Sequence, residues 1–314
     1  MNTHPSISVV TAAYNAERFI ADTIASVRRQ SLADWEHIIV DDGSTDQTAA
    51  VAERAGDGRL RLIRQANAGQ SAAQNAGIAA ARGRRLVLLD ADDLLREESL
   101  ARLSAALDAE PEAVLAYGRV WLIDEEGGAL GARRIFRQSP CADRLADILE
   151  WNFISTGVAM IRTDAMRRVG GYDPDLRMGQ DWECWSRLAA EGPFASVGGE
   201  AVLEYRLRAG SMARLEGIDP QKTRPAVERI YAQPAVHKRF SEAEIGRMRR
   251  RCEAQIYHFS ANEALRLGAY AMARRLFLGA LRRNWARPKT WILFLCALVR
   301  FVPAPIAKRI GFEG

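Results

Sequence analysis

The sequence has few cysteines, and it lacks the common signatures of exported and nucleotide-binding proteins. Its four cysteines lie far apart with no Cys-x-x-Cys pair, which argues against a zinc motif and a disulfide framework. Neither GxGxxG after the first predicted strand nor GxxxxGK followed by Ser or Thr occurs, which argues against dinucleotide oxidoreductases and P-loop enzymes. Because the N-terminus lacks the basic start and apolar core of a signal peptide, we expect a chain that stays in the reducing cytoplasm.

The composition is that of a soluble globular protein. The 314 residues are 48% hydrophobic and 26% charged, enough for one large domain or two unequal ones. The net charge of +5 hides an asymmetry, since residues 216–314 hold 19 Lys and Arg against 8 Asp and Glu, and the remainder holds 25 against 31. The basic surplus therefore belongs to the C-terminal region and the acidic surplus to the rest.

The most informative stretch is an apolar run at residues 85–93 that ends in three carboxylates, Asp90, Asp92 and Asp93. The run predicts a buried strand of a parallel sheet, which would deliver these carboxylates to the sheet edge where ligands bind. A cation would stabilise such a cluster, and oxygen ligands suit Mg²⁺ or Mn²⁺. The alternative is an acidic turn in which Asp92 or Asp93 caps a helix that starts near Arg96.

Strand and helix patterns alternate through the first hundred residues. A β-rich run at 7–15 that ends in a polar turn predicts the first strand, and further strands are expected at 35–40, 60–63 and 86–89. Helices are expected between them, one capped by Ser44 or Thr45 and one running from 67 to 83. This order predicts an α/β fold with a mostly parallel, doubly wound sheet flanked by helices. Side chains that follow three of the strands would then meet at one edge, which favours a site over a set of helix caps: Thr11, Tyr14, Asn15, Asp41, Asp42, Asp90, Asp92 and Asp93.

Further elements are expected beyond residue 100. The pattern predicts a strand at 113–117, an irregular excursion to Pro140 with a hairpin turn at 127–128, a strand at 155–161, and a short helix capped by Thr163. Asp181 falls at the start of a helix, where a carboxylate is favoured by the helix dipole. On these grounds alone Asp181 is a helix cap.

Taken together, these residues resemble the family 2 glycosyltransferases, which are inverting enzymes of the GT-A fold. Each segment alone is a weak signal, but they occur in the family's order over roughly the first two thirds of the chain. The matching segments are 9–15 (VVTAAYN), 40–46 (VDDGSTD), 67–69 (NAG), 75–77 (NAG), 88–93 (LLDADD), 170–173 (GGYD) and 180–182 (QDW).

The resemblance implies a GT-A fold with a C-terminal α-helical extension, and a function in moving sugar from a nucleotide diphosphate sugar, with a UDP-sugar preferred, to a hydroxyl acceptor. Residues 1–100 would bind the donor, 101–215 the acceptor, and 216–314 would form a basic helical region. Asp181 would be the catalytic base and Asp92 would hold Mg²⁺ or Mn²⁺. The donor site would consist of Thr11, Ala12, Tyr14, Asn15, Glu17, Asp42, Gly69, Asp90, Ala91 and Arg206.

Two positions depart from the family pattern. Gln180 stands where the family commonly has Glu, and Gln74 where it commonly has Arg, so the grip on the diphosphate would rely more on the metal and on Arg206. Both departures favour a second hypothesis, a catalytically silent module that binds nucleotide sugars. A third hypothesis, nucleotidyl transfer to sugar phosphates, would want a basic Gly-rich loop after the first strand, and residues 12–17 supply none.

The C-terminal region reads as helical, with a helical hairpin preferred over a tetratricopeptide repeat. Nucleic-acid binding is not expected, because no aromatic platform accompanies the arginines. The apolar run at 290–302 is too short to cross a bilayer, but residues 285–309 combine it with Trp285, Trp291 and flanking cations. We expect this segment to lie in the membrane interface rather than in the core, and to bring the site to a glycan or lipid-linked acceptor at the inner face of the membrane.

Overall fold

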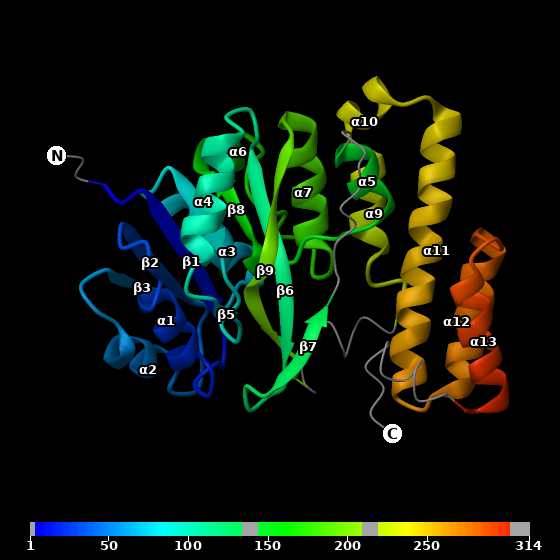
Figure 1. Ribbon diagram of the computed structural model, residues 1–314, viewed down its shortest axis with the longest axis horizontal. Coiled ribbons are helices and arrows are strands. Elements are labelled where there is room, and N and C mark those ends of the chain that lie inside the picture. Colours follow the sequence, from blue (N-terminus) through cyan, green and yellow to red (C-terminus); the bar gives the residue numbers. More distant parts are fainter. Residues whose placement is uncertain (1–3, 134–143, 209–218, 302–314) are drawn as a thin grey trace. The chain divides into compact units, whose positions relative to one another are not determined.

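The computed structural model describes residues 4–133, 144–208 and 219–301. The chain divides into two compact units, which Figure 1 shows in ribbon form. The first comprises residues 1–148 and 152–207, and the second comprises 149–151 and 208–314. Each unit is described separately.

The first unit is built on one sheet in the order β3-β2-β1-β4-β8-β6-β9-β5, with β7 paired to β6. The pairs β3–β2, β2–β1, β1–β4 and β6–β9 are parallel, so the expected parallel, doubly wound arrangement is confirmed for the N-terminal strands. The short strands β5, β7 and β8 join antiparallel. The strands are β1 (Ile7–Ala13), β2 (Trp35–Asp41), β3 (Leu60–Arg64), β4 (Arg85–Leu88), β5 (Leu94–Leu95), β6 (Leu115–Ile123), β7 (Ala129–Arg133), β8 (Ala159–Arg162) and β9 (Phe194–Arg206).

Helices cover both faces of this sheet (Figure 1). Gly77 of α3 lies so close to Val10 of β1 that a methyl group there would overlap it, so α3 covers the face that carries Val10. Ile39 points to the opposite face, because Val10 is aligned with Ile38, and it packs in a cluster with residues of α1 and α2. The helices and the one 3₁₀ turn are α1 (Ile20–Arg28), α2 (Thr48–Ala55), α3 (Gln70–Ala80), α4 (Ser99–Ala109), α5 (Arg144–Glu150), η1 (Thr156–Val158), α6 (Thr163–Arg168) and α7 (Gln180–Glu191).

Three expected helix caps are wrong. Asp92 and Asp93 are followed by strand β5 and not by a helix, because the chain runs on to pair with β9 before α4 begins at Ser99. Helix α2 begins at Thr48, whose backbone N–H donates to Asp46 Oδ1 at 2.9 Å, so neither Ser44 nor Thr45 caps it. Thr163 is itself the first residue of α6, and its hydroxyl donates to the Gly83 carbonyl at 2.6 Å.

The hairpin expected at residues 127–128 is present between β6 and β7. Gly127 has φ +91°, a conformation that favours glycine, and the Gly128 N–H donates to Asp124 Oδ1 at 2.6 Å. The rest of the expected excursion, up to Pro140, falls largely outside the described residues.

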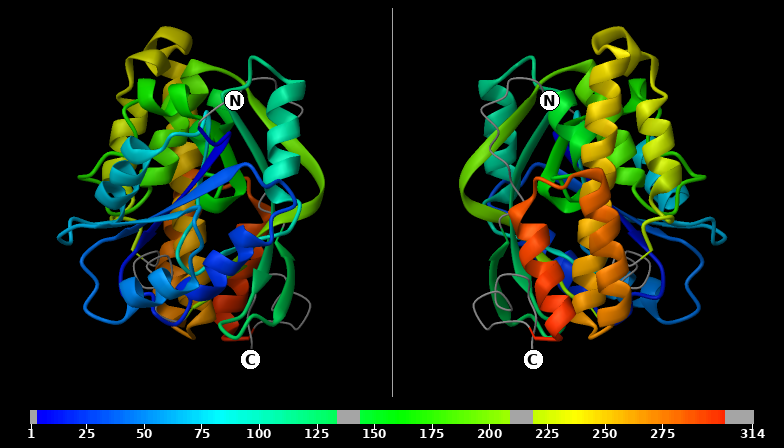
Figure 2. Two further views of the ribbon diagram at one scale, coloured as in Figure 1. Left: turned by 90° about the vertical axis from the view of Figure 1, so that its left-hand side faces the viewer. Right: turned by 90° about the vertical axis from the view of Figure 1, so that its right-hand side faces the viewer.

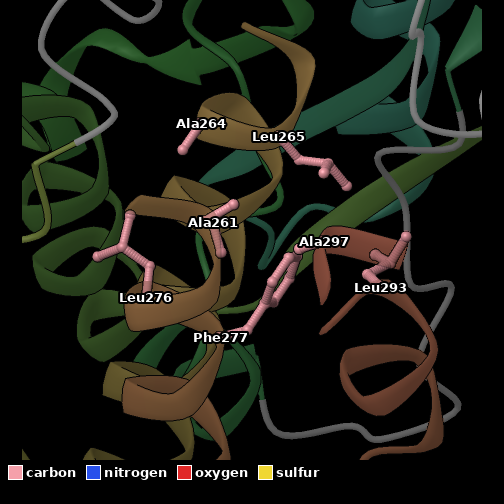
Figure 3. Packing of buried hydrophobic residues seen from close by; sticks show 8 residues of the cluster. Ala261, Ala264, Leu265, Leu276, Phe277, Leu293 and Ala297 are labelled. Atoms are coloured by element: carbon pink, nitrogen blue, oxygen red, sulfur yellow. The ribbon is translucent and has the colours of Figure 1, made fainter. Parts of the chain in front are cut away.

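The second unit is helical, and its elements are α9 (Arg224–Tyr231), α10 (Pro234–Arg239), α11 (Glu242–Arg266), α12 (Tyr270–Arg283) and α13 (Pro288–Val299). Ser241 and Glu244 form a reciprocal capping box at the start of α11. Helices α11 and α12 pack as the expected hairpin, and α13 lies beside α12 (Figures 1 and 2). One buried hydrophobic cluster joins these three helices (Figure 3). Its members include Leu265 of α11, Phe277 of α12, and Leu293 and Ala297 of α13. Within the described residues no helix is both long and apolar enough to cross a bilayer.

Candidate active site

The loops that follow β1 and β2 are tied together by hydrogen bonds. Asn15, with φ +48°, accepts at Oδ1 from the Thr45 N–H at 2.9 Å, and its own N–H donates to Ser44 Oγ at 3.0 Å. Glu17 Oε2 accepts from the Gln47 N–H at 2.8 Å. Two of the predicted donor-binding residues, Asn15 and Glu17, therefore fix the shape of this edge through their side chains.

The other predicted residues of the first loop differ in exposure. Thr11 is fully buried, and its hydroxyl lies 3.0 Å from His37 Nε2. Burial lowers the pKa of His37 to about 3, so this imidazole is neutral at physiological pH. Ala12 is partly exposed, and the Tyr14 side chain is 52% exposed beside it. Tyr14 thus offers an accessible aromatic face at the sheet edge.

The Asp42 carboxylate organises the loop between β3 and α3. Its Oδ1 accepts from Gln65 Nε2 at 2.7 Å and from the Ala68 N–H at 2.9 Å, and its Oδ2 accepts from the Gly69 N–H at 2.9 Å. Gly69 precedes α3 with φ +90°, which is accessible to glycine at little cost. Asp42 is 3% exposed, so its present role is to hold this loop in place at the donor-side edge.

Residues 90–93 form a tight acidic turn between β4 and β5, which we call the acidic turn. The Asp93 N–H donates to the Asp90 carbonyl at 3.2 Å, and the Thr23 hydroxyl bonds the carbonyls of Ala91 and Asp93 at 2.9 and 3.0 Å. Asp90, Ala91 and Asp92 are partly exposed, whereas Asp93 is buried. Burial, followed by repulsion from Asp92 and Asp90, raises the pKa of Asp93 well above its usual range. Burial therefore disfavours the ionised form of Asp93.

Arg206 supports the acidic turn from strand β9. Its backbone N–H donates to Asp93 Oδ1 at 3.0 Å, and its Nε donates to the Asp92 carbonyl at 3.0 Å. The guanidinium also reaches the Glu125 carbonyl at 2.8 Å and packs 5.2 Å from the centre of the Phe19 ring. All these contacts are to protein groups, and the residue is 4% exposed. In this arrangement Arg206 positions the acidic turn.

Two glutamines connect the acidic turn to the start of α7. Gln70 Nε2 donates to Asp90 Oδ1 at 3.0 Å, and Gln180 Nε2 donates to Gln70 Oε1 at 3.3 Å. Asp181 follows Gln180 directly, in the first turn of α7. Residues 70, 90 and 180 are distant in sequence, and their hydrogen bonds bring the two predicted functional segments together.

The Asp181 carboxylate is held in a defined orientation. Asn152 Nδ2 donates to its Oδ2 at 2.9 Å, and the Trp182 N–H donates to its Oδ1 at 2.7 Å. Burial raises the pKa of Asp181, although both hydrogen bonds act to lower it. A carboxylate with a raised pKa is a stronger base, which suits proton abstraction. Asp181 is the second residue of α7, after the N-cap Gly179, and its bond to the Trp182 N–H lies within the first turn of this helix.

Helix α3 also holds the segment that leads into α7. Asn75 Nδ2 donates to the Tyr172 carbonyl at 2.7 Å, and the Tyr172 N–H returns a bond to Asn75 Oδ1 at 2.8 Å. Gly171 adopts φ +72°, and a methyl group there would overlap Asn75 Oδ1. Residue 171 is therefore best occupied by glycine, because a side chain is strained at this positive φ and would also overlap Asn75.

The acidic turn fits a divalent cation through its chemistry. Asp90 and Asp92 are partly exposed and offer carboxylate oxygens, which are the ligands that Mg²⁺ and Mn²⁺ prefer. Within the described parts of the chain no group of three His, Cys, Asp or Glu side chains is arranged to hold a metal by itself.

Sequence reasoning missed Gln70 and Asn152 as residues of the site. Gln70 opens an Ala-rich helix, where its neighbours predict only helical structure. Asn152 lies in a short connection with no periodic pattern, and its role becomes visible only through its 2.9 Å bond to Asp181.

Comparisons with known proteins agree with this architecture. The family model described as "Glycosyl transferase family 2" matches residues 8–170. The succinoglycan biosynthesis protein ExoO of Rhizobium meliloti is 31% identical over 233 residues, which cover 68% of this chain and 64% of that protein. The match thus spans less than two thirds of that relative's length.

Solved structures share the fold at low sequence identity. The TarS 1–349 structure of S. aureus in complex with UDP-GlcNAc gives a TM-score of 0.65 at 17% identity, over 98% of this chain and 88% of that one. The mannosyltransferase PcManGT of Pyrobaculum calidifontis, solved with GDP-Man and Mn²⁺, gives 0.62 at 16% identity, over 99% and 85%. The fold is GT-A, and since the family match covers more than half of the sequence, the chain belongs to glycosyl transferase family 2.

Proposed function

We propose that the protein is an inverting glycosyltransferase that moves a sugar from a nucleotide diphosphate sugar, preferably a UDP-sugar, to a hydroxyl acceptor. Residues 1–100 bind the donor and residues 101–215 bind the acceptor. The single observation that carries this proposal is the hydrogen-bonded link from Asp90 through Gln70 to Gln180, which joins the acidic turn to the segment that bears Asp181.

The proposed transfer reaction needs one general base. Asp181 takes the proton of the acceptor hydroxyl as the oxygen attacks the anomeric carbon, and the bond from that carbon to the phosphate oxygen breaks. Direct displacement from the opposite face inverts the anomeric configuration, and the nucleoside diphosphate leaves. A positioned general base contributes typically about 10²–10⁴-fold to the rate.

The donor is held by the sheet edge. Tyr14 lies exposed where a base or ribose would stack, and Gly69 and Ala91 present backbone with little side chain in the way. Asp92 would hold Mg²⁺ or Mn²⁺, which would neutralise charge on the leaving diphosphate, and Asp90 would contact the ribose or the sugar. Arg206 keeps the turn in the shape that this requires.

The test is release of nucleoside diphosphate from a panel of UDP- and GDP-sugars by the purified chain, with Mn²⁺ and with a chelator. We expect slow hydrolysis of at least one donor with metal and none with chelator. Binding of a nucleotide sugar without any turnover, with or without acceptor glycans, would favour the silent module instead.

Surface polysaccharide or glycolipid assembly is the proposed setting, supported by the relative named for succinoglycan biosynthesis. Helix α13 supports a peripheral contact with the inner face of the cytoplasmic membrane. One face of α13 is buried, through Leu293, Cys296 and Ala297 among others, while the other exposes an apolar row: Trp291, Ile292, Leu295, Leu298 and Val299. Residues 264–312 contain ten Lys and Arg and no Asp or Glu, which suits anionic headgroups.

A further inference from the structure

A small polar pocket lies between the start of α3 and the segments that precede α7. Its lining is uncharged and consists of primary amides and hydroxyls: Gln70, Ser71, Gln74, Thr156, Tyr172 and Gln180. Gln70 and Gln180 are the residues that link the acidic turn to α7, so the pocket adjoins the proposed reaction centre. A group bound there would belong to a molecule that occupies this centre.

Gln74 is the feature of the pocket that calls for a ligand. It is 1% exposed, and neither its Nε2 nor its Oε1 has a hydrogen-bond partner among the residues that the structure describes. Buried amides nearly always have hydrogen-bond partners, because an amide that is buried without them has lost its hydrogen bonds to water and gained none in exchange. Gln70 and Gln180, in contrast, both have partners. The unmatched donor and acceptor of Gln74 are therefore available to a bound group.

The chemistry of the lining selects among sugar groups. A hydroxyl donates and accepts at once, as an amide does, so it satisfies both atoms of Gln74. A carboxylate only accepts, and within the described parts of the chain no cationic side chain lines the pocket to offset its charge.

We propose that this pocket binds a hydroxyl of the transferred sugar and that Gln74 makes the protein selective for uncharged hexosyl donors over hexuronosyl donors. The inference rests on the proposed function, since it assigns the sugar class of the same donor.

The test is calorimetric binding with Mn²⁺ of the nucleotides UDP and GDP, of UDP-glucose and GDP-mannose, and of the corresponding hexuronates. The wild-type chain is compared with Gln74→Met, which keeps the shape but removes the amide, with Gln74→Glu, and with Gln221→Met as an exposed control. Thermal unfolding of the unliganded proteins reports whether Gln74 stabilises the fold.

We expect the wild type to bind its hexose donor at least about fivefold more tightly than the hexuronate. Gln74→Met should weaken hexose binding by about 3- to 10-fold, as loss of one hydrogen bond does, and leave the free nucleotide within about twofold. The unliganded Gln74→Met protein should melt about 2–4 °C higher, because an unpaired buried amide is gone. Gln74→Glu should weaken hexose binding as well and disfavour the hexuronate further.

The outcomes separate the two proposals. Normal nucleotide binding with hexose binding unchanged in Gln74→Met, or no preference over the hexuronate in the wild type, overturns the pocket assignment alone. A lower melting temperature in Gln74→Met, with hexose affinity retained, assigns Gln74 a structural role and also overturns it. Failure of the wild type to bind any of the nucleotides overturns the proposed function and the pocket assignment with it.

Discussion

At the scale of single residues, Asp181 is the most exacting test of the proposed chemistry. Asp181→Asn keeps the size of the side chain and removes the base, so we expect turnover to fall by about two orders of magnitude or more with donor affinity near normal. Because burial raises the pKa of Asp181, the acid limb of the wild-type rate profile should lie above the ordinary carboxyl value.

The matched control for that variant is Asp164→Asn, an exposed carboxylate that pairs with Arg168 at 2.7 Å on α6. It should leave turnover unchanged. If Asp181→Asn behaves like this control, Asp181 serves only the start of α7.

Asp92 provides a second residue-scale prediction. Asp92→Ala should abolish metal-dependent transfer, measured as nucleoside diphosphate release with Mn²⁺. Its melting temperature should be equal to or slightly above that of the wild type, because the charge of Asp92 is one cause of the raised pKa of Asp93. Glu53→Ala, which removes an exposed carboxylate on α2, serves as the control. Full metal-dependent activity in Asp92→Ala would refute the metal assignment.

At the scale of elements, the segment before α7 depends on two adjacent glycines that differ in one respect. Gly170 and Gly171 both have positive φ, +81° and +72°, but only a methyl group at 171 would overlap Asn75. We expect Gly170→Ala to cost about 1–2 kcal/mol from backbone strain alone. Gly171→Ala should cost about 1–3 kcal/mol more because of the overlap, measured by urea unfolding. Equal losses would mean that Asn75 moves aside freely.

Helix α13 is joined to α11 by a hydrogen bond that depends on pH. Thr290 Oγ1 lies 2.9 Å from His258 Nδ1, and the pKa of His258 is lowered to about 3 by burial and, to a smaller extent, by Arg287 and Lys289. A lowered folded-state pKa gives stability that is complete above the unfolded value near 6.5 and is lost as the pH falls toward 3. The free energy of unfolding should therefore drop by about 1.4 kcal/mol per pH unit for this group.

The comparison is between the wild type and His258→Gln, unfolded by urea at pH 7 and pH 5 and followed by circular dichroism. The wild type should lose about 2 kcal/mol more than the variant over this interval. His37 acts in the same direction in both proteins, because burial lowers its pKa to about 3 as well. An identical loss in the two proteins would show that His258 stays neutral on unfolding or titrates normally when folded.

The elements were largely predictable, whereas the contacts between them were not. Apolar runs that alternate with helical patterns predicted β1 through β4 and the helices between them, since burial on both faces leaves a continuous apolar strand. The strand β5 was missed because two residues carry no periodicity, and its pairing with β9 depends on positions more than one hundred residues away. The Gln70 and Asn152 contacts were missed because they join segments that lie 20 to 110 residues apart in the sequence. Asp42 and Asp92 are visible in the sequence as carboxylates that follow strands, whereas the catalytic role of Asp181 was implied by the family resemblance, because its position at a helix start predicted only a cap.

At the scale of the whole molecule, the second unit carries the exposed apolar row of α13, which has no role in the proposed transfer reaction. Replacing Leu295 and Leu298, which are 56% and 45% exposed, by Glu should remove binding to anionic vesicles in co-sedimentation, because it inserts charge into the row. Leu267→Glu, at a residue 68% exposed elsewhere in the same unit, should bind as the wild type does. High salt should weaken wild-type binding, as headgroup attraction requires.

Equal sedimentation of the double variant and the wild type, or none by either, would mean that the row is not a membrane contact. Truncation is a poorer test, since Leu293 and Ala297 of α13 belong to the buried cluster of the second unit and their removal would expose it.

The placement of Arg206 has a consequence for how such chains recombine in evolution. The family match ends at residue 170, yet Asp181 and the arginine that supports the acidic turn both follow it, and the second unit resumes at Arg208. A crossover at the edge of the recognisable family segment would separate the acidic turn from its support and from the proposed base. Exchange of C-terminal units among relatives is therefore expected to break the chain after Leu207, so that β9 is inherited together with the N-terminal strands.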